Sequence, residues 1–350
     1  MTAITAKTPP GSTTNGTSSA QQQASRPAPP KQTALAGVWA KPNAVPAGDH
    51  PYIFVNGQML PKNQAMVSVY DHGLLYGDGI FEGIRVYKGK IFKCGRHMDR
   101  LWKCAAGIHL EIPISREHMV GVMQQCIDAN GIVDGYIRLV VTRGFGTLGL
   151  DPRKCPVPGV ICVADQISLF PAEMYEQGMR VIVAHRPTNP LVCLDPRVKS
   201  LNYLNHIMAK VEGIQFGCHE VVRLNLDGDV CEGSGDNLFM IKNGVVYTPP
   251  PEAGILEGIT REFVMQTICP ALGVRCVEKR FKLPELLAAD EVFLTGSAAE
   301  IICVTQIDQY DAATRKVSAE KKISAGEGPL TKRLRAKFRE IVTSDQVPID

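Results

Sequence analysis

The 350-residue sequence predicts an α+β protein built from two successive regions that both mix strands and helices. Short apolar runs bounded by turn residues are typical of buried strands, and they outnumber the stretches with helical spacing. Few strands alternate regularly with helices, so a repeated β-α-β arrangement is not indicated. We therefore expect a small α+β domain over residues 52–165, a linker over 166–171 and a larger β-rich domain over 172–342 with helices outside its strands.

The first region is predicted to begin with two hairpins. Asn56-Gly57 and Lys88-Gly89 are two-residue turns within Y-I-F-V-N-G-Q-M-L-P and G-I-R-V-Y-K-G-K-I-F. Apolar residues then recur at helical spacing, which predicts helices over 96–108 and 117–129. Buried strands are expected after them, at 136–143 and 159–164.

The second region is predicted to be richer in strands, and it shows no internal repeat. Its helices are expected at 203–217, 260–271 and 283–287, where apolar residues recur every three or four positions. Its strands are expected at 179–184, 220–226, 237–241, 245–249, 274–279 and 291–295.

The composition argues against several classes of protein. The net charge of +3 is small and no long basic run is present, so a nucleic-acid partner is not expected. No apolar stretch approaches the roughly 18 to 20 residues that a membrane span needs. The 11 cysteines form no C-x-x-C pair and no Cys/His cluster with zinc spacing, so we expect no metal site. Free thiols in a reducing compartment, the cytoplasm, are the favoured interpretation.

Residues 1–48 differ in composition from the rest of the chain. They are rich in Thr, Ser, Ala, Gln, Pro and Gly, and the first acidic residue is Asp49. Such a segment buries too little apolar surface to offset its ordering entropy, so a disordered tail is expected. An organelle transit peptide is the alternative, but only four basic residues and no clear amphipathic stripe are present.

Lys199 is the first candidate for a catalytic residue. It stands in D-P-R-V-K-S-L-N-Y, between Val198 and Ser200, where an extended segment is expected to become a helix. Partial burial there would favour the neutral amine, the form that makes Schiff bases with carbonyl compounds. Taken alone, the residue is also compatible with an ordinary solvated surface lysine.

Other motifs give Lys199 chemical partners. Glu232 opens the small-residue loop C-E-G-S-G-D-N and could keep a heterocyclic nitrogen protonated. Ile259 and Thr260, in G-I-L-E-G-I-T-R, would present N–H groups at a helix start, which is a phosphate site. The small residues of T-G-S-A-A-E-I (295–301) would let backbone amides approach a carboxylate.

An arginine in G-R-H-M-D-R-L-W could reach the same phosphate. Arg100 lies among apolar neighbours in the middle of the predicted helix, and Arg96 is the alternative. Considered one at a time, Glu232 is compatible with an ordinary acid in a turn, Thr260 with a helix cap and Arg100 with a surface arginine. Together, a lysine, a carboxylate and a phosphate site describe a protein that binds pyridoxal phosphate.

The ordered set of motifs resembles the class IV (fold type IV) pyridoxal-phosphate aminotransferases, and most closely the branched-chain amino acid aminotransferases. The resemblance spans about residues 52–342. It implies a small N-terminal α/β domain, a larger β-rich pseudo-barrel domain and pyridoxal 5′-phosphate as cofactor. It also implies a homodimer or higher homo-oligomer, because the family completes each site with a neighbouring subunit. The motifs, in the family's order, are Y-G-D-G-I-F-E-G-I-R, H-M-D-R-L, Y-I-R, V-K-S-L-N-Y, E-G-S-G-D-N-L-F, G-I-T-R and D-E-V-F-L-T-G-S-A-A-E-I.

The resemblance assigns cofactor roles to individual residues. Lys199 would form the Schiff base and carry the proton between substrate and cofactor, and Glu232 would pair with the pyridine nitrogen. Tyr203 would hydrogen-bond the phenolate oxygen, although the segment from lysine to tyrosine is one residue shorter than in some branched-chain enzymes. Leu256 would pack on the ring face. The residues implied around the phosphate are Arg100, Ile259 and Thr260, and Ser297 is implied as a further cofactor-binding residue.

The resemblance also assigns a pocket for amino acids and 2-oxo acids. Tyr136 and the Ser297–Ala298 turn would hold the α-carboxylate, and Arg138 would hold the distal carboxylate of glutamate. The residues implied along the substrate side chain are Phe81 and Tyr76. The implied reaction is ping-pong transamination of L-leucine, L-isoleucine and L-valine with 2-oxoglutarate.

Two other activities of the same fold are alternatives. T-R-G at 142–144 resembles D-amino acid transaminases, in which the arginine, Arg143 here, binds the α-carboxylate. Phe81, where those enzymes have tyrosine, and the Y-I-R motif favour the L-branched-chain interpretation. Aminodeoxychorismate lyase shares the cofactor lysine, but E-G-I-R and Arg138 count against it.

Overall fold

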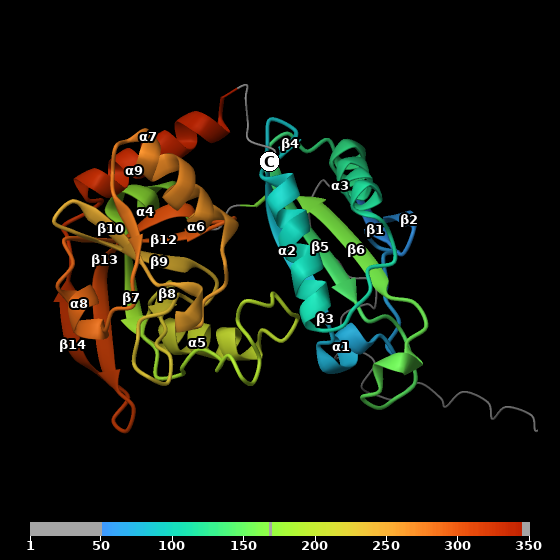
Figure 1. Cartoon of the computed structure of the whole chain (residues 1–350), viewed down its shortest axis with the longest axis horizontal. Helices are drawn as coiled ribbons and strands as arrows, with labels where there is room; N and C mark the ends of the chain where they lie inside the picture. The colour runs from blue at the N-terminus through green and yellow to red at the C-terminus, as the bar shows by residue number, and fades with distance from the viewer. Residues whose placement is uncertain (1–50, 168–169, 345–350) are drawn as a thin grey trace, which may run out of the picture. The chain divides into compact units, whose positions relative to one another are not determined.

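The structure is a computed structural model that describes residues 51–167 and 170–344 (Figure 1). These residues form a six-stranded sheet and an eight-stranded sheet with accompanying helices, which confirms the predicted α+β class. They belong to one compact unit, Val45–Asp350. The predicted tail, residues 1–48, and two residues of the predicted linker lie outside the described residues. The predicted domain boundaries stay predictions.

The six-stranded sheet is antiparallel and has the order β2-β1-β6-β5-β3-β4. Its strands are β1 (Tyr52–Val55), β2 (Gln58–Pro61), β3 (Gly79–Tyr87), β4 (Lys90–Ile91), β5 (Gly135–Thr142) and β6 (Gly159–Asp165). The helices of this region are α1 (His72–Tyr76), α2 (Cys94–Gly107), α3 (Arg116–Asn130) and the short 3-10 helix η1 (Pro152–Lys154).

Both predicted hairpin turns are confirmed. Asn56 and Gly57 join β1 to β2 with φ angles of 49° and 90°. Lys88 and Gly89 join β3 to β4 with φ angles of 50° and 73°. Two successive positive φ values match a type I′ turn, whose twist suits the strands on either side.

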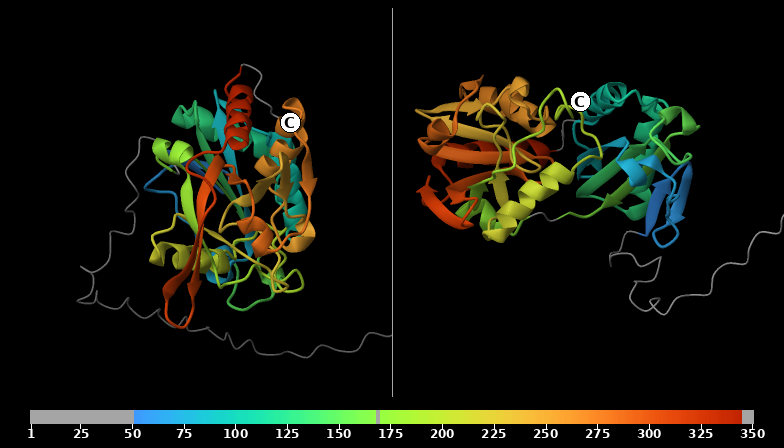
Figure 2. Two further views of the ribbon diagram at one scale, coloured as in Figure 1. Left: turned by 90° about the vertical axis from the view of Figure 1, so that its left-hand side faces the viewer. Right: turned by 90° about the horizontal axis from the view of Figure 1, so that it is seen from below.

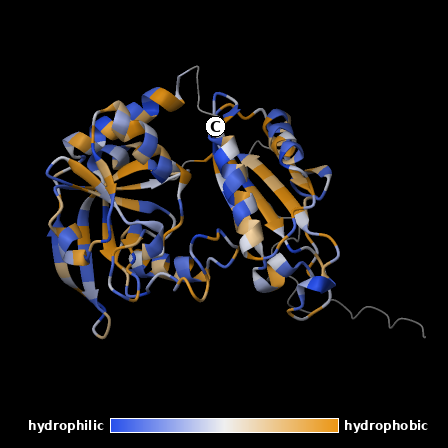
Figure 3. Ribbon diagram, viewed as in Figure 1, coloured by the Kyte–Doolittle hydropathy of each residue, from blue (hydrophilic) through white to orange (hydrophobic). Residues whose placement is uncertain are grey.

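Side chains of β5 alternate between the two faces of the six-stranded sheet. Ile137, Leu139 and Val141 are buried in an apolar core that the sheet shares with α2 and α3. Figure 3 shows these strands as mainly hydrophobic and the viewer's side of α2 as mainly polar. Tyr136 and Arg138 point to the opposite face, which carries the candidate site.

The eight-stranded sheet mixes parallel and antiparallel pairs, in the order β11-β10-β9-β12-β13-β7-β8, with β14 paired to β13. Its strands are β7 (Met179–Val183), β8 (Glu220–Val222), β9 (Asn237–Lys242), β10 (Val245–Thr248), β11 (Cys276–Glu278), β12 (Glu291–Gly296), β13 (Glu300–Asp311) and β14 (Lys316–Lys322). The helical segments are α4 (Ala172–Gln177), α5 (Leu204–Gln215), η2 (Pro251–Ala253), α6 (Ile259–Phe263), the π-helix η3 (Val264–Ile268), α7 (Cys269–Ala271), α8 (Leu283–Leu287) and α9 (Pro329–Val342).

Some elements differ from the sequence predictions. The helix predicted at 260–271 is a continuous run of α6, η3 and α7, so its middle turn is a π-helix. The strand predicted at 220–226 ends at Val222, and beyond it only the single bridge between Leu224 and Val230 remains. The patterns predicted neither α9 nor the long β13–β14 ribbon, which Figure 2 shows clearly. Among the described residues, no helix is both long and apolar enough to cross a membrane.

Candidate active site

Lys199 lies in an extended segment that runs beside β3 and ends where α5 begins. The Phe81 N–H donates to the Lys199 carbonyl at 3.0 Å, and the Leu201 N–H donates to the Gly79 carbonyl at 2.9 Å. Ser200 and Ile80 form the bridge between the two segments. The backbone of Lys199 is thus fixed on the six-stranded sheet, at the junction of extended chain and helix that the sequence predicts.

The Lys199 ammonium group sits between two aromatic rings. Its Nζ donates to the Tyr203 hydroxyl at 3.1 Å and lies 4.4 Å from the Phe81 ring centroid. The Tyr203 ring stacks on His206, with centroids 4.4 Å apart. Burial and the nearby Arg223 lower the pKa of His206 to about 4, so this imidazole is neutral at physiological pH. Aromatic side chains therefore surround the Lys199 amine, and no carboxylate of the described residues contacts it.

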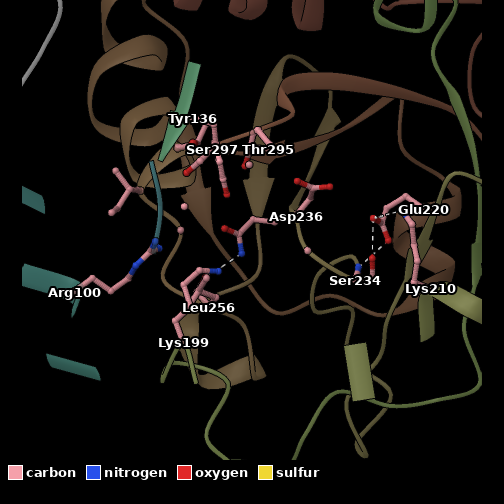
Figure 4. A pocket seen from close by; sticks show the side chains of 18 of the residues that line it. Arg100, Tyr136, Lys199, Lys210, Glu220, Ser234, Asp236, Leu256, Thr295 and Ser297 are labelled. Atoms are coloured by element: carbon pink, nitrogen blue, oxygen red, sulfur yellow. Dashed lines mark hydrogen bonds and ion pairs between the residues drawn. The ribbon is translucent and has the colours of Figure 1, made fainter. Parts of the chain in front are cut away.

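A cavity of about 270 Å³ opens in front of Lys199 (Figure 4). Its volume suits a small ligand with a few converging polar groups. The predicted site residues that line it are Arg100, Tyr136, Lys199, Leu256, Ile259, Thr260, Ser297 and Ala298. Lysine, arginine, tyrosine and small residues from distant parts of the sequence thus meet in one cavity.

Glycines make room for the polar side chains of this cavity. A Cβ added to Gly83 would lie 1.7 Å from the Tyr136 hydroxyl, so only glycine leaves that hydroxyl its place. A Cβ on Gly258 would lie 1.9 Å from Oδ1 of Asn237. These glycines stand in the motifs E-G-I-R and E-G-I-T-R, and their steric role explains why those motifs accompany the site.

Glu232 is a buried carboxyl beside the cavity. Its Oε2 accepts hydrogen bonds from Asn237 Nδ2 at 3.1 Å and from the Leu256 N–H at 3.0 Å. Burial raises the pKa of Glu232 to about 7, although the Leu256 N–H and the positive charges of Arg223 and Lys199 oppose the shift. A buried carboxyl of this kind gains stability from a cationic ring nitrogen placed next to it.

Arg100 faces the cavity, but Glu82 already holds it. Its Nε and Nη2 donate to the two carboxylate oxygens of Glu82, both at 2.7 Å, and its Nη1 donates to the Glu257 carbonyl at 3.0 Å. Burial alone would raise the pKa of Glu82, but Arg100 and His97 overcome that effect and hold the pKa well below its usual range. The alternative residue, Arg96, is half exposed, pairs with Asp99 and Glu262, and does not line this cavity.

The start of α6 provides backbone donors at the same end of the cavity. Ile259 and Thr260 are buried residues of its first turn, and both line the cavity. Gly258 stands at the N-cap, so no side chain caps the free N–H groups of that turn. Uncapped N–H groups beside a guanidinium favour a phosphate.

The face of the six-stranded sheet next to Lys199 carries three of the predicted substrate residues, of which Tyr136 lines the cavity whereas Phe81 and Arg138 do not. Gly83 is paired with Arg138 in the register of β3 and β5, and Phe81 is paired with Val140. The Arg138 guanidinium lies 4.7 Å from the centroid of Phe81 and 5.8 Å from that of Tyr136. Arg138 is exposed and makes no ion pair with any carboxylate of the described residues. The result is an apolar surface, formed by Phe81, with one available cation, Arg138, at its edge.

Arg143, the arginine of the alternative interpretation, is in a different situation. It is buried, and its Nε and Nη2 donate to both carboxylate oxygens of Asp78 at 2.9 and 3.0 Å. It also donates to the carbonyls of Ile108 and His109 at 2.8 and 2.7 Å. These four bonds use nearly all donors of a guanidinium, so Arg143 ties loops together in this chain.

The structure does not place Tyr76 in the cavity. The residue is 37% exposed at the end of α1, and its hydroxyl accepts a hydrogen bond from the Gly149 N–H at 3.0 Å. Its predicted place in the substrate pocket stays a prediction. The roles of the other site residues also stay predictions, since position alone does not test chemistry.

Sequence reasoning missed several polar residues of the cavity. Asp236 and Asn237 follow Glu232 within E-G-S-G-D-N, so that motif held a signal for them. Thr295, the first residue of T-G-S-A-A-E-I, lines the cavity as well. Glu220 and Lys210 also line it, and no motif points to these two residues. Within the part of the chain that the structure describes, no cluster of His, Cys, Asp and Glu could hold a metal ion.

The donors of the cavity fit pyridoxal phosphate. One end offers a guanidinium and uncapped amides for a phosphate, and Glu232 offers a carboxyl for a ring nitrogen. Lys199 lines the same cavity, and its amine donates a hydrogen bond to the Tyr203 hydroxyl. A phosphate, a basic ring nitrogen and an aldehyde carbon are the groups that such a set would bind.

Comparison with known families agrees with this assessment. Residues 79–307 match the family model "Amino-transferase class IV". The chain is 44% identical over 291 residues to the "Putative branched-chain-amino-acid aminotransferase" of Methanocaldococcus jannaschii, covering 83% of this chain and 96% of that protein. It is also 32% identical to a D-alanine aminotransferase of Bacillus licheniformis, covering 84% of this chain and 98% of that protein.

Solved structures of the same family share the fold. The branched-chain amino acid aminotransferase of Escherichia coli superposes with a TM-score of 0.78 at 30% identity, covering 85% of this chain and 97% of that chain. The branched-chain aminotransferase of Thermoproteus uzoniensis with norvaline gives a TM-score of 0.76 at 33% identity, covering 85% and 96%. Another branched-chain enzyme, with a TM-score of 0.77 at 32% identity, was crystallised with pyridoxamine 5′-phosphate. These neighbours confirm the predicted type IV fold.

Proposed function

The chain belongs to the class IV aminotransferases, which depend on pyridoxal phosphate, and from that premise we propose that it transfers the amino group of L-leucine, L-isoleucine and L-valine to 2-oxoglutarate. The products are branched 2-oxo acids and L-glutamate, made in a ping-pong sequence in which each product leaves before the next substrate binds. The relative with 44% identity supports this choice through its name. A structural neighbour at 31% identity was crystallised with 4-methylvaleric acid, a branched carboxylic acid.

The observation that carries the proposal is the contrast between Arg138 and Phe81, its neighbour. Phe81 offers an apolar surface to an aliphatic side chain, while the Arg138 guanidinium over its ring has no carboxylate partner among the described residues. One pocket must accept both leucine and glutamate in a ping-pong reaction. An apolar lining with one free cation at its edge meets both needs.

The α-carboxylate, which both substrates share, is assigned to Tyr136 and the Ser297–Ala298 turn. All three residues line the cavity. Gly83 gives the Tyr136 hydroxyl its space, so the hydroxyl can donate to a carboxylate without moving. The backbone amides of the turn that follows Gly296 add further donors.

The cofactor is assigned to the surrounding residues of the cavity. Bound there, pyridoxal phosphate supplies an electron sink for the substrate Cα. Glu232 would hold the ring nitrogen, Tyr203 the phenolic oxygen, and Leu256 one ring face. Lys199 would bind the cofactor carbonyl carbon and move the proton at the substrate Cα. The residues assigned to the phosphate are Arg100, Ile259 and Thr260, and Ser297 is assigned as a further contact of the cofactor.

A homodimer is part of the proposal. Exposed apolar side chains gather in two segments of the first region, around α1 and in the loop between β5 and β6. Monomeric proteins rarely leave so many large apolar side chains in water. We assign this surface, with Tyr76, to contact with a second copy of the chain. The exposed apolar residues are Met66, Val67, Val69, Leu74, Phe145, Leu148, Leu150 and Val157.

The compartment is proposed to be the cytoplasm. All 11 cysteines are free thiols, and Cys193 is exposed. Exposed thiols persist in a reducing environment.

D-amino acid transamination is the second candidate, because relatives with 31 to 33% identity are D-alanine aminotransferases and the chain has the T-R-G tripeptide. Against it, Arg143 is occupied by Asp78 and two carbonyls. Amino-donor profiling with 2-oxoglutarate and both enantiomers of each donor tests the choice. L-leucine, L-isoleucine and L-valine should be the best donors, and faster turnover of D-alanine would reject the proposal.

A further inference from the structure

Asp236 is a buried carboxyl of the cavity that no residue of the described chain pairs with. The residue is 8% exposed and lines the cavity, and Figure 4 shows it among the other lining residues. Within residues 51–167 and 170–344, the hydrogen bond of Asp236 is made by its backbone carbonyl, which accepts from the Gly233 N–H at 2.7 Å. Buried polar groups are almost always paired, so an unpaired one facing a cavity calls for a ligand.

The other buried acids beside the cavity accept hydrogen bonds from the chain. Oε1 of Glu220 accepts from the N–H groups of Val221 and Ser234, both at 2.8 Å, and its Oε2 accepts from Ser234 Oγ at 2.9 Å and Lys210 Nζ at 3.0 Å. Glu232 accepts two hydrogen bonds, as described above. Asp236 therefore differs from both in having all its hydrogen-bonding capacity available.

The sheet register places this carboxyl at the turn assigned to the substrate carboxylate. Thr295 pairs with Asn237 in the antiparallel register of β12 and β9, so the next residues along, Gly296 and Asp236, lie opposite each other. A Cβ on Gly296 would lie 2.1 Å from Oδ1 of Asp236, so the carboxyl rests against that glycine. The Thr295 hydroxyl, which also lines the cavity, is buried without a partner among the described residues. Two unused polar groups thus flank the same turn.

The charges around Asp236 favour its neutral form. Burial raises its pKa to about 7, Glu220 on β8 adds to the rise, and Lys210 on α5 and Lys199 oppose it. A carboxyl in such a site can stay protonated at neutral pH and donate a hydrogen bond, as ketosteroid isomerase shows with an aspartic acid. An ionised Asp236 would instead repel an anion at the neighbouring turn.

We propose that Asp236 is a further substrate-binding residue, which donates a hydrogen bond from its neutral carboxyl group to the carboxylate of the substrate held at the Gly296–Ala298 turn. This inference rests on the proposed function, since it takes the α-carboxylate to lie at that turn. The proton stays on Asp236 during binding, so no proton is exchanged with the substrate. Substrate affinity then falls when Asp236 loses its proton at alkaline pH.

The test compares wild type with Asp236→Asn and Asp236→Ala as holoenzymes, with Asp227→Asn as the control at an exposed turn. The KM and kcat for L-leucine are measured from pH 5.5 to 9. The wild-type KM should rise roughly 10-fold above neutral pH, the size of one hydrogen bond to a charged group. Asp236→Asn keeps an N–H donor at every pH, so its KM should stay flat. Asp236→Ala should raise the KM roughly 10-fold at pH 6 with little change in kcat, because binding and not chemistry is affected.

Two small ligands distinguish binding of the substrate carboxylate from binding of the substrate amine. The affinity of 4-methylvalerate should fall with rising pH in wild type and not in Asp236→Asn, while 3-methylbutylamine should bind both equally. Loss of amine binding in Asp236→Asn would overturn the proposal, because an ionised Asp236 would then bind the ammonium group. Equal pH dependence in wild type and Asp236→Asn would also overturn it. If the wild-type enzyme prefers other amino donors, the proposed function is wrong but the proposal for Asp236 is not. The carboxylic acid that lacks the amino group of the preferred donor then replaces 4-methylvalerate in the test of Asp236.

Discussion

One buried acid of the first region and two buried acids of the second are treated in opposite ways. In the first region, Glu82 is hydrogen-bonded to both Arg100 and His97, and these two partners hold its pKa well below the usual range against the effect of burial. In the second region, burial raises the pKa values of Glu232 and Asp236 to about 7. Glu82 is a structural charge that the chain neutralises by itself, whereas we propose that the other two acids contact bound ligands.

Two arginines of the first region, one in β5 and one just after it, also differ in whether the chain pairs their charge. Arg143 donates hydrogen bonds to Asp78 and to two backbone carbonyls, while Arg138 lies exposed over the ring of Phe81. One arginine holds the fold, and the other is free for a substrate. The arginine that the chain leaves unpaired over Phe81 is therefore the better candidate for contact with a substrate.

The largest expected effect is the loss of Lys199. Lys199→Ala should lower kcat by several orders of magnitude, because the bond to the cofactor and the proton transfer are lost together. Borohydride treatment of wild type followed by peptide mapping should place the reduced cofactor adduct on Lys199. The exposed Lys242, paired with Asp290, provides a matched control, and Lys242→Ala should keep full activity. An adduct on another lysine would contradict the assignment.

The structural role of Glu82 can be broken separately. Glu82→Gln leaves the buried Arg100 without its charge partner, which should lower the free energy of unfolding by about 3 to 5 kcal/mol. Since the folded-state pKa of Glu82 is depressed, its stabilisation is present above the unfolded pKa and is lost as the pH falls toward the folded value. Urea unfolding at neutral and acidic pH measures this: the gap between variant and wild type should narrow in acid. A constant gap would argue against the ion pair.

The opposite pH dependence is expected for Glu232. Its folded-state pKa is raised, so its contribution is most favourable below the unfolded value and is lost as the pH rises toward about 7. Glu232→Gln should therefore stabilise the cofactor-free protein at pH 8 by up to roughly 3 kcal/mol and by much less at pH 4.5. The same variant should lose roughly 10- to 150-fold in kcat, because an amide cannot stabilise a cationic ring nitrogen. Unchanged turnover would show that Glu232 does not face the ring.

Much of the fold could be predicted because local chemistry decides it. Asn56-Gly57 needs two positive φ values, and the alternation of β5 puts Ile137 and Leu139 inside. The β14 strand (Lys316–Lys322) escaped prediction because it is a charged, mostly exposed strand that packs almost no apolar face, so it leaves no periodic signal.

The candidate site could be predicted in its residues but not in its pairings. The motifs located Lys199 and the start of α6, since each needs a particular residue at a particular local position. Distant segments of the chain bring Glu82 to Arg100 and Gly296 to Asp236. Such partners follow from sheet register, which the local pattern of one strand does not determine.

The most direct test of the account is the effect of Arg138→Ala on the KM values for 2-oxoglutarate and L-leucine. The variant should raise the KM for 2-oxoglutarate and glutamate roughly 10- to 150-fold, since the distal carboxylate loses a charged hydrogen bond. The KM for leucine, which has no distal carboxylate, should change little. Arg153→Ala, at an exposed arginine, is the control and should change neither value. If Arg138→Ala leaves glutamate and 2-oxoglutarate kinetics intact while Arg143→Ala abolishes the use of every donor by an otherwise folded enzyme, the branched-chain assignment is wrong.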